Sequence, residues 1–181
     1  MLSAMKTYAL FFSGILACST IFVAGNESNA ATPPTDPQIA MIAVTADSID
    51  IDAGKLAAEK SSNPKVKEFA EMMVRDHTSV NKQATDLAAK LKLTPEESDT
   101  SRSLKADADK NLAKLKGLSG AAFDKAYIDN EVAYHEAVIK AVTETLIPNT
   151  KNADLKKLLE SAGPIFTSHL THAKELQSSL K

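Results

Sequence analysis

The chain has 181 residues, of which 44% are hydrophobic and 24% charged, a balance typical of a globular protein. Its formal net charge is −2 and it has only two arginines, Arg75 and Arg102, which argues against the concentrated basic face of a nucleic-acid-binding protein. The chain has no glycine-rich phosphate loop, serine-centred elbow or His-Glu-x-x-His motif, and no motif identifies a small-molecule substrate. Catalysis by a serine or cysteine nucleophile is therefore unsupported, and we expect a protein that is not an enzyme.

Residues 1–30 have the organisation of a secretion signal. Lys6 supplies a positive charge, residues 8–23 are almost all apolar, and small residues up to Ala30 suit cleavage. Cleavage there would remove Cys18, the only cysteine, and leave a periplasmic protein without thiols. The alternative is a membrane-anchored lipoprotein, because the residues before Cys18 resemble a lipobox. An uncleaved anchor is less favoured, because the apolar run is slightly short for a membrane span.

Residues 31–37 contain three prolines and are predicted to form a stiff tether before a helical domain over 38–181. In that domain apolar residues recur with a period of about 3.6, and no alternating stretch is long enough for a strand. The patterns predict long helices over 36–60, 64–92, 121–147 and about 151–180. A capping box at Thr94-Pro95-Glu96-Glu97 predicts another helix, which reaches Lys116 with a thin apolar stripe.

The predicted fold class is all-α, a ferritin-like antiparallel four-helix bundle with a shorter crossover helix. Short turns at 61–63 and 148–150 join the long helices into two hairpins. The helix after Thr94 is then a connector packed on the outside. In the first helix, the apolar seam that should face the core is formed by Ile39, Ile42, Ala46, Ile49, Ala53 and Leu56.

The sequence contains four histidines: His77, His135, His169 and His172. His77 and His169 stand in apolar seams, where a polar group without a partner would cost about 1–3 kcal/mol. Together with His135 they lie near the middle of three different helices, so we expect three imidazoles to meet inside the bundle. The first helix offers Asp50 at the same depth, and Glu131 precedes His135 by one turn.

Such a cluster has two interpretations. Imidazoles and carboxylates suit a metal ion such as Fe, Mn, Zn or Cu, with Asp76, Tyr127 and Asp124 around the ligands. The alternative is a purely structural His–carboxylate network in an envelope stress or interaction protein. A redox enzyme using the same centre is a third, weaker hypothesis. Met72 and Met73 are predicted to fill the core rather than bind copper.

Three segments resemble the bacterial family called domain of unknown function 4142: 69–77, 123–127 with His135, and His169-Leu170. The resemblance extends over residues 37–180 and implies an exported protein of the ferritin-like superfamily, without implying an activity. Di-iron proteins of that superfamily carry Glu-x-x-His on two helices. Here Val74 and Phe166 stand three residues before His77 and His169. We therefore expect a mononuclear His-rich site or a hydrogen-bonded network, and no ferroxidase or oxygenase activity inherited from the fold.

Overall fold

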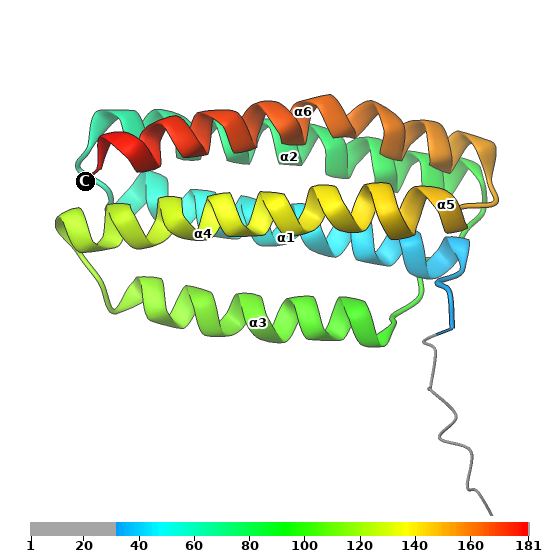
Figure 1. Ribbon diagram of the computed structural model, residues 1–181. Coiled ribbons are helices and arrows are strands. Elements are labelled where there is room, and N and C mark those ends of the chain that lie inside the picture. Colours follow the sequence, from blue (N-terminus) through cyan, green and yellow to red (C-terminus); the bar gives the residue numbers. More distant parts are fainter. Residues whose placement is uncertain (1–31, 181) are drawn as a thin grey trace, which may run out of the picture. The chain divides into compact units, whose positions relative to one another are not determined.

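Residues 32–180, the part of the chain that the computed structural model describes, fold into helices and connecting loops (Figure 1). In chain order the elements are α1 (Asp36–Lys60), α2 (Pro64–Lys90), α3 (Asp99–Lys116), α4 (Gly120–Ala141), the π-helical turn η1 (Val142–Leu146), α5 (Ile147–Asn149) and α6 (Ala153–Ser179). The predicted all-α class is confirmed. The predicted secretion signal and Cys18 lie outside the described residues.

The four long helices form a bundle in which α1 pairs with α2 and α4 pairs with α6. In Figure 1, α1 and α6 run in one direction while α2 and α4 run in the other, so the pairs are two antiparallel hairpins. Helix α3 connects the two hairpins in the sequence. It lies along the bundle and packs on the outer side of α1 and α4. It buries only Ser101 and Leu115. The predicted external connector is therefore present.

The core is divided along the bundle into two apolar clusters. One includes Phe69, Met73 and Phe123, and the other includes Ile39 and Phe166. On each of α1, α2, α4 and α6, the residues between these clusters include buried polar side chains. A polar layer therefore crosses the middle of an otherwise apolar core.

Helix α1 begins at Asp36, where the helix over 36–60 was predicted to begin. Asp36 and Pro37, which the predicted tether over 31–37 also included, therefore belong to the helix. Proline suits this position because first-turn N–H groups have no acceptor within the helix. The Asp36 carboxylate accepts hydrogen bonds of 2.9 Å from the backbone N–H groups of Lys151 and Asn152. These bonds tie the start of α1 to the loop before α6.

The predicted start of the connector helix at Thr94 is wrong. Helix α3 begins at Asp99, with Ser98 as its N-cap and a capping box between Ser98 and Ser101. The residues before it remain non-helical, and the Glu96 N–H donates to the Pro37 carbonyl over 3.0 Å. This backbone bond to the start of α1 replaces the helical turn that the Thr94 motif favours locally.

The buried face of α1 also differs from the predicted apolar seam. Ala46, Ile49 and Leu56 are only half-buried, whereas Asp47 and Asp50 are 3% exposed. The centre of α1 therefore turns an acidic face inwards, and the reason lies on the helices opposite.

Candidate metal centre

Three imidazoles meet in the polar layer. His77 on α2, His135 on α4 and His169 on α6 are each 1% exposed. Their ring centroids lie 5.1 to 5.6 Å apart. One ring nitrogen from each residue can be chosen so that all three lie within 4.8 Å of one another. The structure thus brings together the three histidines that were expected to meet because each lies near the middle of its helix.

Each of these rings is anchored through one nitrogen. His77 Nδ1 lies 2.8 Å from Asp47 Oδ1, and His169 Nε2 lies 3.1 Å from Asp76 Oδ2. His135 Nδ1 lies 3.0 Å from the backbone carbonyl oxygen of Glu131. A carbonyl or carboxylate oxygen accepts a hydrogen bond, so the anchored nitrogen of each ring carries the proton. The other nitrogen then keeps its lone pair.

These second nitrogens are buried and have no hydrogen-bond partner among the described residues. They are His77 Nε2, His135 Nε2 and His169 Nδ1. His77 Nε2 also lies 3.4 Å from Asp50 Oδ2, a contact with a potential oxygen ligand. Histidines that bind metal ions usually donate their other N–H to a carboxylate or a carbonyl, as all three do here.

The rings of His135 and His169 are uncharged at neutral pH. Burial lowers the pKa of His135 to about 3, and the neighbouring His77 and His169 lower it further. Burial also lowers the pKa of His169, although the hydrogen bond to Asp76 opposes the shift. Neutral imidazole is the form that binds a metal ion.

Two carboxyl groups complete the centre. Asp50 and Glu131 are 3% and 0% exposed, and together with His135 they form a second group of donor atoms within 4.8 Å of one another. Burial raises the pKa of Glu131 to about 8. Burial, followed by the nearby Glu131, raises the pKa of Asp50 well above its usual value. Two buried acids this close cannot both be ionised unless a cation lies beside them.

Tyr127 and Asp124, which the sequence placed around the ligands, differ in their relation to the centre. Burial raises the pKa of Tyr127, as do the charges of Glu131 and Asp50, and its buried hydroxyl has no hydrogen-bond partner among the described residues. Asp124 is buried with Oδ1 unpartnered, and no contact in the described part of the chain joins it to the histidines. His172 is outside the cluster, half-buried, with its ring centroid 5.4 Å from that of Phe69 in an edge-to-face arrangement.

Asp47 was not identified from the sequence as a residue of the centre. Its role depends on the ring of His77, 30 positions away in the sequence. The available signal was its spacing, since Asp47 and Asp50 stand three residues apart and so share a face of α1 with Ala53 and Gly54.

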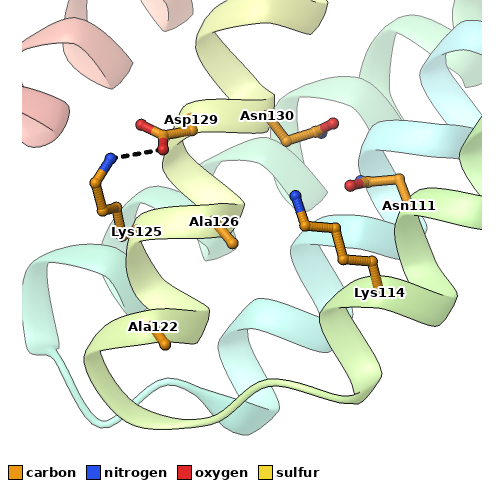
Figure 2. Close-up of a pocket in the computed structure, with 7 residues that line it drawn as sticks. All are labelled: Asn111, Lys114, Ala122, Lys125, Ala126, Asp129 and Asn130. Carbon is orange, nitrogen blue, oxygen red and sulfur yellow. Dashed lines mark hydrogen bonds and ion pairs between the residues drawn. The ribbon is translucent and has the colours of Figure 1, made fainter.

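A hollow of about 460 Å³ between α3 and α4 offers a different kind of site (Figure 2). Its charged side chains, Lys114, Lys125 and Asp129, lie at an open surface, and Lys125 already pairs with Asp129 over 2.7 Å. It contains no histidine, so the buried cluster is the stronger candidate for a metal ion.

By its architecture, this protein is a helical bundle with imidazoles and carboxyl groups across the middle of its core. The chain belongs to the family described as domain of unknown function (DUF4142), whose model matches residues 23–176. The family resemblance noted in the sequence is thereby confirmed.

A solved structure described as "CopM in the Cu(II)-bound form" has a similar fold, with a TM-score of 0.65. The match covers 83% of this chain and 100% of that chain at 16% sequence identity, a level that shows a shared fold alone. No curated protein matches the sequence. Among residues 32–180, no helix is long and apolar enough to span a membrane.

Proposed function

We propose that this protein binds a divalent transition-metal ion, copper(II) in the first instance, in the middle of its bundle. The ligands are His77 Nε2, His135 Nε2 and His169 Nδ1, with Asp50 and Glu131 supplying oxygens. The observation that carries the proposal is the state of the three rings. Each is held by a hydrogen bond through one nitrogen, and the other nitrogen is buried and unpartnered.

The donor set favours particular metals. Imidazole suits Zn, Cu, Fe and Ni, and the cluster of histidines and carboxyl groups contains no thiolate, a ligand that favours copper(I). Copper(II) has the highest affinity among divalent first-row ions for a given nitrogen and oxygen site. The structural neighbour described with bound Cu(II) adds support for this choice.

A purely structural network explains the cluster less well. Such a network should satisfy its buried polar atoms, since an unpaired one costs about 1–3 kcal/mol. A proton shared between Asp50 and Glu131 would satisfy one Glu131 oxygen. It would leave the second nitrogens of three imidazoles unpaired in the core, as well as the Tyr127 hydroxyl. A metal ion accounts for the three nitrogens at once.

The secretion signal predicted over residues 1–30 also supports a proposal about where the protein acts. We propose that the protein carries its ion in the periplasm, outside the cytoplasm. Electrostatic attachment to nucleic acid has no part in this function, given the formal net charge of −2.

The test is a copper(II) titration of protein purified after expression of the full chain, with the bound metal measured by elemental analysis. The variant is the double substitution His77→Gln, His169→Gln. The matched control is His172→Gln, which changes a histidine of the same α6 helix outside the cluster. We expect one ion per chain in the unchanged protein and in the control, and none in the double variant. The structural network would be favoured if the unchanged protein takes up no ion. It would also be favoured if the unchanged protein, the control and the double variant bind the ion equally.

A further inference from the structure

We propose that Asp76 is the point at which the ion enters the centre, and that Arg75 restrains it. This inference rests on the proposed metal site. The ligands themselves are closed off from solvent: the three histidines are 1% exposed and the two acids 3% or less. An ion from solution must therefore first meet a residue that touches both the cluster and the surface.

Asp76 is such a residue. Its Oδ2 atom lies 3.1 Å from His169 Nε2, and its side chain is 27% exposed. The groups that anchor the other two rings, the Asp47 side chain and the Glu131 carbonyl, belong to residues that are 3% and 0% exposed. Of the three anchoring residues, Asp76 alone extends from a buried ring to solvent.

The side of the bundle around Asp76 is also the less covered one. Helix α3 packs over α1 and α4, and Figure 1 shows α2 and α6 on the opposite side of the bundle. Asp76 belongs to α2 and its partner His169 to α6. The half-buried His172 lies one turn along α6 from His169 on the same side. At the α2–α6 seam a single residue, Asp76, connects solvent to the ligand His169.

Arg75 occupies the outer oxygen of Asp76. Its Nε atom lies 2.8 Å from Asp76 Oδ1, and its own side chain is 69% exposed. An exposed ion pair is worth about 0–1 kcal/mol, so an arriving cation can displace the guanidinium. Arg75 also repels a cation that approaches the same carboxylate. The two neighbours should therefore affect metal uptake in opposite directions.

This opposition separates an entry role from a merely structural one. If Asp76 only orients His169, loss of Asp76 and loss of its Arg75 partner should both loosen the ring and weaken binding. If Asp76 attracts the ion, removing its charge slows uptake, whereas removing Arg75 accelerates it. The variant Asp76→Asn keeps an oxygen that can accept the His169 N–H while losing the negative charge.

The experiment measures the rate of copper(II) uptake by stopped-flow quenching of tyrosine emission, since the chain has no Trp. Asp76→Asn and Arg75→Gln are compared with the unchanged chain at low and high salt. Lys82→Gln and Asp86→Asn are the matched controls, because this exposed pair on the same helix is joined over 2.6 Å. We expect Asp76→Asn to slow uptake roughly tenfold and to weaken its salt dependence, Arg75→Gln to accelerate it, and the controls to match the unchanged chain.

Equal slowing by both variants, or uptake at the unchanged rate in Asp76→Asn, would overturn the entry role while leaving the metal site intact. A chain that binds no copper(II) at equilibrium would overturn the proposed function itself, and the entry route with it.

Discussion

His77 on α2 and Asp47 on α1 are joined by a hydrogen bond of 2.8 Å inside the core. Both side chains are almost completely buried, at 2% and 4% exposure. The bond fixes the proton on His77 Nδ1 and thereby frees Nε2 for the centre. It also explains why α1 turns an acidic face inwards, since the carboxylate gains a donor there that it would otherwise find only in solvent.

Replacing Asp47 should weaken metal binding although Asp47 is not a ligand. We expect Asp47→Ala to lower copper(II) affinity by about 10–100-fold, because the His77 ring loses the partner that fixes its orientation. Asp47→Asn should lose less, because its amide oxygen still accepts the His77 N–H. Isothermal titration of both variants measures the difference. Unchanged affinity in Asp47→Ala would contradict the anchoring role.

Glu131 should make the metal-free protein less stable as the pH rises. Its pKa is raised from 4.5 to about 8 in the fold, so the unfolded chain ionises at lower pH than the folded one. The stability that the protonated carboxyl contributes is therefore fully present below pH 4.5 and is lost as the pH rises through about 8. We expect Glu131→Gln to flatten this decline in urea unfolding curves recorded with a chelator.

The pH range of that experiment matters because His135 acts in the other direction. Its pKa falls from 6.5 to about 3 in the fold, so its stabilising contribution is present above pH 6.5 and is lost at lower pH. Measurements from pH 6.5 upwards thus separate the carboxyl from the imidazole. Glu136→Gln, an exposed acid of the same helix, should keep the slope of the unchanged chain. A Glu131→Gln variant with an equally steep decline would contradict the raised pKa.

Gly54 should be required for the close approach of α1 to α2. A Cβ atom there would lie 3.0 Å from the Ala70 carbonyl oxygen and 3.0 Å from Val74 Cγ2. We expect Gly54→Ala to lower the free energy of unfolding by about 1–3 kcal/mol through this overpacking. Gly117→Ala is the control, because its φ of −77° suits alanine and its nearest atom is at 3.5 Å. The control should gain about 0.4–1 kcal/mol, and equal effects in urea unfolding would contradict the packing argument.

Bound copper(II) should stabilise the fold. An ion that binds only the folded chain adds about 2.7 kcal/mol at a free concentration one hundred times its Kd. For a domain of this size that corresponds to roughly 5–11 °C in Tm. Thermal unfolding followed by circular dichroism should show this shift in the unchanged chain and in His172→Gln. The double variant His77→Gln, His169→Gln should show no shift, and an equal shift there would contradict the ligand assignment.

Much of the bundle could be predicted because its helices obey local rules. Asn63 caps α2 and Pro64 occupies its first turn, so α2 begins at residue 64, where the helix over 64–92 was predicted to begin. The meeting of three histidines followed from equal helix lengths and short turns, which place the middle residues of the helices at one level. That argument needs no knowledge of side-chain contacts.

The errors arose where a distant contact outweighed a local preference. The apolar periodicity wrongly placed Ile49 and Leu56 at the middle of the buried face of α1. Asp47 is buried there because the His77 imidazole faces it, and a periodic pattern of apolar residues cannot predict that contact. The capping box at Thr94 was outweighed by the backbone bond from Glu96 to Pro37. Both partners lie far from these residues in the sequence, so pattern alone could not find them.

The end of the fourth helix also differs from the prediction, for a local reason. The fourth helix was expected to end at Ile147, but a π-helical turn over Val142–Leu146 carries the helical path on to Asn149. Pro148 lacks the N–H that an α-helix would need four residues after Glu144, and a wider turn accommodates that missing bond.

The most direct measurement is anomalous diffraction at the copper absorption edge from crystals of the protein loaded with one equivalent of copper(II). The account predicts a single strong peak about 2.0–2.1 Å from His77 Nε2, His135 Nε2 and His169 Nδ1, with a carboxylate oxygen of Asp50 or Glu131 also in contact. A peak on the surface with the three imidazoles unliganded would contradict the central claim. It would leave the buried cluster as a structural network.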